Sequence, residues 1–393
     1  MKLLENYRVL DFGRYIAAPY CGFLLAQLGA EVIRVERPGG HEDRFLVPIT
    51  DQGYGTMYLQ MNANKKGVTL DMSKPAGKKL ARELIATSDI VIANLPPKTL
   101  KALSLDYESL CQLKEDIILV ANTAFGSKGP FANNIGFDGM AQAISGANFF
   151  SGFPDQPIRC TVNYLDFSTA IAAALGTLAA IMHKEKTGEG QIVETSLLGT
   201  ALTLNNSMLM EQAVTNIQRP PKGNHGQLAG PSDIFKTKDG HIVISVVGPY
   251  MFKRCTRLLN KPEWLTDERF KDDTARGNNN HLLCEVLGKW CSERTNEEAL
   301  QELKAAKLPA GPVLSLQQAL DHPMIQSLEH FEFFNYLTDG NAAPIAKAPF
   351  QLSKTPLPPI QSAPEIGSHN RAIFESLGYS LKDILRLERE GIL

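Results

Sequence analysis

An aspartate with the chemistry of a nucleophile stands at the start of the most apolar run in the chain. Asp166 lies in the segment Asn-Tyr-Leu-Asp-Phe-Ser-Thr-Ala (163–170), before a stretch rich in Ala, Leu and Ile that reaches Met182. The stretch predicts a buried helix, with Asp166 in its first turn or at its cap. Unpaired backbone N–H groups and the helix dipole favour a carboxylate there, so we expect a pKa near or below its reference of ~3.9.

Two interpretations of Asp166 follow from this segment alone. An ionised carboxylate in an apolar setting can attack an acyl carbon and form a covalent intermediate. Asp is also a preferred N-cap residue, so a purely structural role accounts for the same position. From this segment alone, the structural role as a cap is favoured over catalysis.

Polar side chains also follow two predicted strands. Arg37 comes just after one strand, and the segment at 94–99, which contains Asn94, Leu95 and Thr99, follows another. Ligands bind at the carboxyl ends of strands in open α/β sheets, and Arg suits phosphate. These positions therefore form a candidate ligand site, although a surface salt bridge is the alternative for Arg37.

The elements that must position these residues alternate between strands and helices. Such a βαβ rhythm predicts a parallel, doubly wound sheet covered by helices, in a large Rossmann-like domain. The expected strands are 7–12, 31–35, 67–70, 89–93, 117–122 and 192–194, and the expected helices are 19–28, 75–87 and 196 to the mid-210s.

The turn after the first strand does not carry a dinucleotide or ATP signature. It runs from Gly13 to Pro19 without the pattern G-x-G-x-x-G, and no G-x-x-x-x-G-K-[ST] occurs in the chain. Binding of NAD or ATP through these loops is therefore disfavoured.

A loop region rich in Pro and Gly, beginning near Pro220, marks a change in composition and a domain boundary. We expect a large domain from residues 1–215 and 331–393, a linker at 216–225 and a smaller α+β domain at 226–330. The smaller domain begins with a hairpin that has an Asp-Gly turn.

The bulk composition fits a soluble globular protein. Hydrophobic residues make up 44% of the 393 residues, charged residues 21%, and the net charge is −2. Nothing in this balance points to nucleic acid or to an anionic membrane. The N-terminus lacks an apolar signal core, and the stretch near 171–182 is short and Ala-rich for a membrane span. We expect a cytoplasmic protein.

Cysteine and histidine spacing predicts no metal site. The six cysteines are scattered without a C-x-x-C pair, and the eight histidines form no H-x-x-x-H or H-E-x-x-H cluster. Neither a zinc site nor a disulfide framework is therefore indicated, and we expect most cysteines to be buried small hydrophobes.

Several short motifs accompany the Asp166 segment in a fixed order. They are Glu36-Arg37-Pro38-Gly39, Asn64-Lys65-Lys66-Gly67, Phe125-Gly126 with Gly129-Pro130, Thr187-Gly188-Glu189-Gly190-Gln191, Pro309-Ala310-Gly311-Pro312-Val313 and Leu377-Gly378-Tyr379-Ser380. In order and spacing, over nearly the whole chain, they resemble the class III CoA-transferases. That family includes formyl-CoA:oxalate and crotonobetainyl-CoA:carnitine CoA-transferases, and alpha-methylacyl-CoA racemase shares its fold.

The resemblance favours the catalytic interpretation, because Asp166 falls on the family's catalytic aspartate. It implies that Asp166 moves CoA from an acyl-CoA to a small carboxylic acid through an aspartyl anhydride and an aspartyl-CoA thioester. It also implies a CoA thioester as substrate, no permanently bound cofactor, no metal, and an interlocked ring homodimer.

The resemblance further assigns residues to CoA. Arg37 matches the position that contacts the nucleotide phosphate end. Leu70, Asn94, Leu95 and Thr99 match positions that line the adenine and pantetheine path. For Leu70 and Leu95, packing in the core is an equal alternative.

The chain departs from the family pattern at three places, which limit the assignment of the substrate, and two other functions are alternatives. Phe137 replaces the histidine that the racemase carries before its equivalent of Asp138, so a racemase or epimerase ranks second. A catalytically silent CoA-binding relative ranks third. The glycines at 223–230 are spaced, whereas formyl-CoA transferase has a loop of tandem glycines. His225 within this loop is either an acid/base candidate or a loop residue without a role. Arg14 either receives the acceptor carboxylate or is a surface or dimer-contact arginine.

Overall fold

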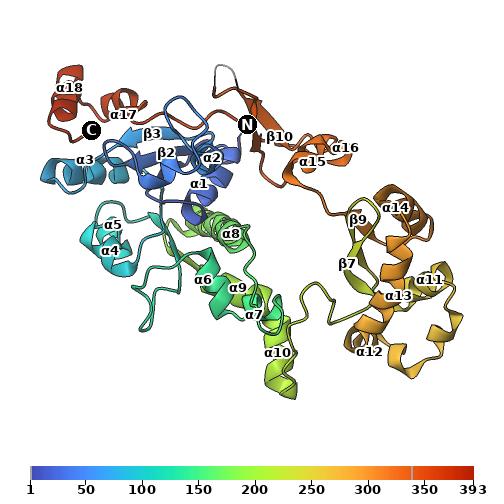
Figure 1. Ribbon diagram of the computed structural model, residues 1–393. Helices are drawn as coiled ribbons and strands as arrows, with labels where there is room; N and C mark the ends of the chain where they lie inside the picture. Colours follow the sequence, from blue (N-terminus) through green and yellow to red (C-terminus); the bar gives the residue numbers. More distant parts are fainter. Residues whose placement is uncertain (1, 338–339) are drawn as a thin grey trace. The chain divides into compact units, whose positions relative to one another are not determined.

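The computed structural model describes residues 2–337 and 340–393, which form two compact units (Figure 1). The first unit comprises Met1–Ser145, Cys160–Met210 and Glu329–Leu393, and the second comprises Gly146–Arg159 and Glu211–Leu328. Each unit has a hydrophobic core of its own. The domain boundaries expected from the sequence stay a prediction.

A six-stranded sheet organises the first unit. Its strand order is β3-β2-β1-β4-β5-β6, and every neighbouring pair is parallel. This is the order of a Rossmann-like fold, in which ligands bind where the order reverses, beside β1 and β4. The parallel sheet expected from the βαβ rhythm is therefore confirmed. The strands are β1 (Arg8–Asp11), β2 (Glu31–Glu36), β3 (Lys66–Thr69), β4 (Ile90–Ala93), β5 (Ile118–Thr123) and β6 (Ile192–Ser196).

Helices cover both faces of this sheet, as Figure 1 shows. Because side chains alternate along a strand, Ile118 and Val120 of β5 face one hydrophobic core while Leu119 and Ala121 face the other. The first face is covered by α1 (Ala17–Gln27), α2 (Thr56–Asn62) and α8 (Tyr164–Thr187), and the second by α3 (Pro75–Ala86), α4 (Pro97–Ala102), α5 (Tyr107–Cys111), α17 (Asn370–Ser376) and α18 (Leu381–Arg389).

The returning C-terminal tail completes the edge of the sheet at β3. The side chain of Asn370 accepts a hydrogen bond from the backbone N–H of Thr69 at 2.8 Å and donates one to its hydroxyl at 2.8 Å. His369 Nδ1 accepts from the backbone N–H of Gly67 at 3.1 Å. Polar side chains of the tail thus satisfy backbone groups that an open edge strand would leave unpaired.

The remaining elements of the first unit are short. They are η1 (Glu42–Phe45), α6 (Asp138–Ile144), α9 (Leu197–Leu204), α10 (Asn206–Thr215, which continues into the second unit), β10 (Phe331–Phe334) and β11 (Ala343–Ala346). The single helix expected from residue 196 is divided at Asn205, whose side chain donates to the carbonyl of Ser145 at 2.9 Å.

The second unit is a small α+β structure. An antiparallel sheet is built from β7 (Ser232–Lys236), β8 (His241–Ser245) and β9 (Ala310–Pro312), and Asp239-Gly240 lies in the expected hairpin turn. The helices assigned to this unit are α7 (Ala147–Phe150), α11 (Gly248–Leu258), η2 (Pro262–Leu265), η3 (Glu268–Phe270), α12 (Asp273–Asn278), α13 (Asn280–Ser292), α14 (Asn296–Ala305), α15 (Leu316–Asp321) and α16 (Pro323–Gln326).

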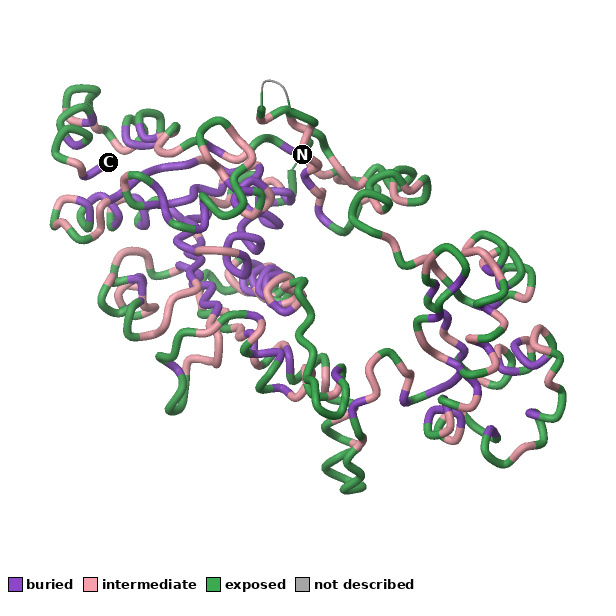
Figure 2. Tube along the Cα trace, in the orientation of Figure 1, coloured by how far each residue is buried: buried purple, intermediate pink, exposed green. Residues whose placement is uncertain are grey.

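Helix α8 combines a buried face of small residues with an apolar exposed face. Ala170, Ala173 and Ala174 allow it to pack closely against α1. On its other side, Ile171, Leu175 and Met182 are 46%, 69% and 56% exposed, and Figure 2 shows where exposed and buried segments lie along the chain. Helix α8 is long and apolar enough to cross a membrane, a property that core helices of soluble proteins can share.

Candidate active site

Asp166 lines a cavity of about 510 Å³ at the carboxyl edge of the sheet. Helix α8 is the crossover between β5 and β6, so its first turn lies at this edge. The loops after β1 and β4 supply Arg14, Asn94 and Leu95 to the same cavity, and α4 supplies Thr99. Asp166 and three residues assigned to CoA by resemblance therefore share one cavity.

A smaller cavity of about 180 Å³ adjoins the first, since Arg14 and Leu95 line both. It also contains Arg37 and Leu70, so the predicted site residues follow a continuous path. Arg37 is exposed, and its Nε donates to the carbonyl of Gly40 at 2.9 Å. Leu70 is buried in the core beneath β3, and its role as a CoA contact stays a prediction.

Asp138 caps the helix that carries Asp166. One oxygen, Oδ2, accepts hydrogen bonds from the backbone N–H groups of Leu165 at 2.7 Å and of Asp166 at 3.0 Å. The side chain of Asn163, at the N-cap position itself, makes no capping bond. Asp138 therefore holds the N–H groups that the sequence interpretation expected to favour the Asp166 carboxylate.

The expectation of a low Asp166 pKa is consequently wrong. Burial of its carboxyl, reinforced by the negative charge of Asp138, raises the pKa of Asp166 to about 7. Removal from water disfavours the charged form, and the helix N–H groups that offset this cost are already bonded to Asp138. Near neutral pH, about half of the Asp166 side chains are ionised.

Asp138 is itself held by a buried amide. Gln142 Nε2 donates to Asp138 Oδ1, and the same amide bonds to the backbone of Cys160, donating to its carbonyl at 3.2 Å and accepting from its N–H at 3.0 Å. Gln142 lies one turn after Asp138 on α6. These contacts hold the Asp138 carboxylate directly in front of the first turn of α8.

In the turn that carries Arg14, three successive backbone N–H groups each donate a hydrogen bond to a side chain. The N–H of Gly13 donates to Asp11 at 2.8 Å, that of Arg14 donates to Asn94 at 2.8 Å, and that of Tyr15 donates to Asp43 at 3.1 Å. The Asn94 amide also donates back to the Arg14 carbonyl at 2.7 Å. Tyr15 has a positive φ of 61°, which an L-residue adopts only when its surroundings impose it.

Buried ion pairs support this turn from below. Lys65 Nζ lies 2.7 Å from Asp11 Oδ2, and Arg34 Nη2 lies 3.0 Å from Asp43 Oδ2. The Lys65 ammonium holds the pKa of Asp11 below its usual range despite burial. Because each carboxylate is paired and also accepts a turn N–H, the turn has little freedom to move.

Replacement of Asn94 by Ala should therefore loosen the Arg14 turn. Two hydrogen bonds to Arg14 are lost, at a cost of roughly 1–3 kcal/mol, and we expect kcat/KM to fall about 10- to 100-fold. Steady-state kinetics with saturating acyl-CoA measures this. Asn134→Ala, an exposed neighbour of the cavity, is the matched control and should retain wild-type rates. Equal losses in both variants would contradict a specific role for Asn94.

Sequence reasoning missed several residues of the cavity. Tyr15 and Phe137 form an edge-to-face aromatic pair with centroids 5.5 Å apart, and both line the cavity. Asn122 and Thr123 reach it from the end of β5, and Ile135 also lines it. The one available signal was the polar side chain of Asn122 at the carboxyl end of an apolar strand, close to the sheet edge where Asn94 follows β4.

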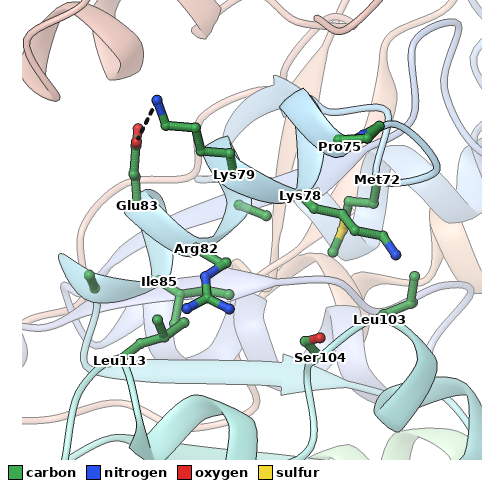
Figure 3. Close-up of a pocket in the computed structure, with 12 residues that line it drawn as sticks. Met72, Pro75, Lys78, Lys79, Arg82, Glu83, Ile85, Leu103, Ser104 and Leu113 are labelled. Carbon is green, nitrogen blue, oxygen red and sulfur yellow. Dashed lines mark ion pairs between the residues drawn. The ribbon is translucent and has the colours of Figure 1, made fainter.

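A second large cavity, of about 580 Å³, contains none of the predicted site residues. It lies over α3 and is bordered by Leu103 and Leu113 (Figure 3). Lys78 and Arg82 line it, while Lys79 pairs with Glu83 at 3.7 Å. It offers cationic and apolar side chains but no carboxylate nucleophile comparable with Asp166.

Comparison with known proteins identifies the class of enzyme. The chain matches the model of CoA-transferase family III over residues 4–370 and belongs to this family. The family expected from the sequence motifs is confirmed, and the protein is a family III CoA-transferase, whose substrates are CoA thioesters and carboxylic acids.

Named relatives and solved structures agree with this assignment. The succinyl-CoA--D-citramalate CoA-transferase of Chloroflexus aurantiacus is 31% identical, covering 99% of this chain and 98% of its own length. Human succinyl-CoA:glutarate CoA-transferase is 29% identical, and the match covers 100% of this chain and 88% of its own length. The crystal structure of Rv3272 from M. tuberculosis superimposes with a TM-score of 0.82 at 28% identity, covering 95% of this chain and 99% of its own.

Proposed function

We propose that this enzyme transfers CoA from succinyl-CoA to a second dicarboxylic acid, with Asp166 as the covalent nucleophile. The observation that carries the proposal is the half-buried Asp166 carboxylate in a cavity that continues towards Arg37 and Leu70. The relatives' names support succinyl-CoA as donor and a dicarboxylate as acceptor.

In the first half of the proposed reaction, the Asp166 carboxylate attacks the thioester carbonyl of the donor. A mixed anhydride forms and the C–S bond breaks, releasing CoA as a thiolate. The thiolate then attacks the aspartyl carbonyl of the anhydride, which releases the donor acid as a carboxylate and leaves an aspartyl-CoA thioester.

The second half repeats these steps in reverse order with the acceptor. The acceptor carboxylate attacks the aspartyl-CoA carbonyl, forms a second anhydride and releases CoA thiolate. Attack of this thiolate on the acceptor acyl carbonyl gives the new acyl-CoA and restores the Asp166 carboxylate. Covalent catalysis of this kind divides one difficult exchange into several easier acyl transfers.

The proposed steps depend on two features of the cavity. Burial of Asp166 removes water from a carboxylate that must attack an acyl carbon, and so strengthens it as a nucleophile. The anhydride and the aspartyl thioester must also be shielded from hydrolysis, and the aromatic pair of Tyr15 and Phe137 borders the cavity where Asp166 lies.

Arg14 is the residue proposed to bind the free carboxylate of the acyl group or acceptor. Among the described residues that line the cavity, it is the only cation. Its present partner is Glu42, with Nη1 3.3 Å from Oε1, in an exposed pair worth at most about 1 kcal/mol. A substrate carboxylate can replace Glu42 at little cost and form a bidentate pair.

Arg14→Ala should therefore raise the KM for a dicarboxylate acceptor by about 10- to 100-fold, the effect of losing a charged hydrogen bond of ~1.5–3 kcal/mol. The KM for a monocarboxylate acceptor of similar length should change little. Arg37→Ala is the control, because it should affect the acyl-CoA and leave the acceptor KM unchanged. An unchanged dicarboxylate KM in Arg14→Ala would remove this role.

Transfer is favoured over racemisation by the lining of the cavity. No histidine occurs among the described residues that line it, and Phe137 occupies the position of the racemase histidine. One of the two proton-transfer groups of a racemase is therefore missing. Deuterium exchange at the α-carbon of an acyl-CoA, in the absence of acceptor, would favour the racemase instead.

The proposed activity is tested by product analysis. The enzyme is incubated with succinyl-CoA and, separately, with citramalate, glutarate, malate or mesaconate, and each new acyl-CoA is separated and weighed. We expect acceptor-dependent products and parallel double-reciprocal plots, because a covalent intermediate divides the two half-reactions. Succinyl-CoA that is only hydrolysed, with no new thioester for any acceptor, would contradict CoA transfer to these acids.

The enzyme is also proposed to act as an interlocked homodimer. The exposed apolar side chains of Ile171, Leu175 and Met182 on α8 support this proposal, because monomeric soluble proteins seldom expose such a row. Sedimentation equilibrium would show twice the chain mass.

A further inference from the structure

A histidine, an aspartate and a cysteine lie close together in the second unit, and none of the three is assigned a role in CoA transfer. His225, Asp233 and Cys284 each offer one ligand atom, and the three atoms all lie within 4.8 Å of one another. The three come from a loop, from β7 and from α13, so only the fold brings them together. No spacing pattern in the sequence predicts this cluster.

The geometry of the cluster is not that of a simple ion pair. Asp233 Oδ2 lies 2.8 Å from His225 Nδ1, yet this buried ring nitrogen forms no hydrogen bond with any residue that the structure describes. The oxygen therefore lies off the axis along which the ring nitrogen donates or accepts. Two ligands of one metal ion have this relation, because each points at the ion and not at the other.

We propose that His225, Asp233 and Cys284 bind a divalent zinc ion, with water as the fourth ligand. Imidazole nitrogen, carboxylate oxygen and thiolate sulfur are the three donor types that zinc prefers. Bond lengths of ~2.0–2.3 Å separate the ligands of a tetrahedral ion by roughly 3.3–3.8 Å, so small side-chain rotations suffice. Water takes the fourth position because three described residues offer ligand atoms here.

Coordination has a defined proton balance. Burial, reinforced by the charge of Asp233, raises the pKa of Cys284 to about 12, so without a cation the sulfur keeps its proton. It donates that proton to Asn280 Oδ1, 3.3 Å away. Zinc binding replaces this weak contact with a Zn–S bond, and the thiol proton leaves to solvent. Nδ1 of His225 binds as neutral imidazole with its proton on Nε2.

The ion would fix one end of the glycine-containing loop at 223–230. The loop is already joined to β7 by the N–H of Gly226, which donates to the carbonyl of Ser232 at 2.8 Å. A zinc ion would also connect His225 to β7 through Asp233 and to α13 through Cys284. An ion that binds only the folded state raises the midpoint temperature of unfolding.

The test uses the untagged, reduced full-length chain and the metal alone. One equivalent of Co²⁺ should give near-ultraviolet thiolate-to-cobalt absorption, and Zn²⁺ should displace it and raise the thermal midpoint. Cys284→Ala should lose the band and weaken Zn²⁺ binding roughly tenfold or more. His225→Gln should also weaken Zn²⁺ binding. Cys291→Ala, a buried cysteine in the same core, is the matched control and should keep the band.

The contrary results are equally definite. Absence of the thiolate band in the wild-type chain with Cys284 reduced, or a band that survives in Cys284→Ala and is lost in Cys291→Ala, would overturn the proposal. So would Zn²⁺ binding that is equal in Cys284→Ala, His225→Gln and wild type. None of these readouts depends on CoA transfer, so the zinc site and the role of Asp166 are tested separately.

Discussion

Asp166→Asn should lower the turnover of CoA transfer by about four orders of magnitude or more, the scale of loss seen when a covalent nucleophile is removed. An amide at this position keeps the shape of the side chain but cannot form an anhydride with the donor acyl group. The binding of acyl-CoA should change little, because Arg37 and Leu95 of the adjoining cavity are untouched. Turnover and the dissociation constant of a non-transferable acyl-CoA analogue measure the two effects.

The sign of the change in stability of Asp166→Asn distinguishes loss of the nucleophile from loss of folding. The pKa of Asp166 is raised in the folded state, so the folded chain binds a proton that the unfolded chain releases between about pH 4 and pH 7. Stability contributed by this group therefore falls as the pH rises through that window. Asp166→Asn should be more stable than wild type at pH 8, by up to ~4 kcal/mol, and indistinguishable below pH 4. An inactive but destabilised variant at pH 8 would contradict this account.

The rate of transfer should also fall steeply on the acid side of neutrality. Only the ionised form of Asp166 attacks the thioester, and its pKa of about 7 leaves roughly one side chain in a hundred ionised at pH 5. We expect kcat/KM to decline about tenfold for each pH unit below 7. A rate that stays level down to pH 5 would show that the ordinary carboxylate pKa expected from the sequence is the correct one.

Asp138→Asn should shift this acid limb to lower pH. An asparagine oxygen can still accept from the N–H groups of Leu165 and Asp166, while the negative charge that raises the pKa of Asp166 is removed. The new amide nitrogen faces Gln142 Nε2, so a stability loss of about 1–3 kcal/mol should accompany the shift.

The matched control for Asp138→Asn is Glu115→Gln, which neutralises an exposed carboxylate outside the cavity. Its acid limb should coincide with that of the wild type, because exposed charges are screened by water and salt. The midpoint of the pH profile is the diagnostic quantity, since a loss of stability lowers the rate without moving that midpoint. An unmoved midpoint in Asp138→Asn would show that the charge of Asp138 does not set the pKa of Asp166.

The sheet could be predicted from the sequence because its strands carry two independent signals. Short apolar runs such as 7–12 and 31–35 are bounded by turn residues, and the helical segment 19–28 separates them, which together predict parallel pairing. The division of the helix after residue 196 was missed. At the break, Asn205 donates a hydrogen bond to Ser145, which lies 60 residues earlier, and no local sequence pattern records such a contact.

The site could be predicted only in part. Asn94 and Arg37 follow strands that end at one edge of a parallel sheet, and the helix that carries Asp166 begins at the same edge, so topology places all three along one path. The raised pKa of Asp166 could not be predicted, because it depends on burial of the carboxyl in the folded chain and on the charge of Asp138, 28 residues earlier. The use of the Asn94 amide to hold Arg14 was hidden for the same reason, since that pair is 80 residues apart.

The most direct test of covalent transfer is the mass of the peptide that contains Asp166. The enzyme is incubated with succinyl-CoA without acceptor, treated with hydroxylamine, digested and analysed by mass spectrometry. We predict a hydroxamate at Asp166 in the wild type and none in Asp166→Asn. An unmodified Asp166 peptide, from enzyme that converts succinyl-CoA to a new acyl-CoA once acceptor is added, would contradict the central claim.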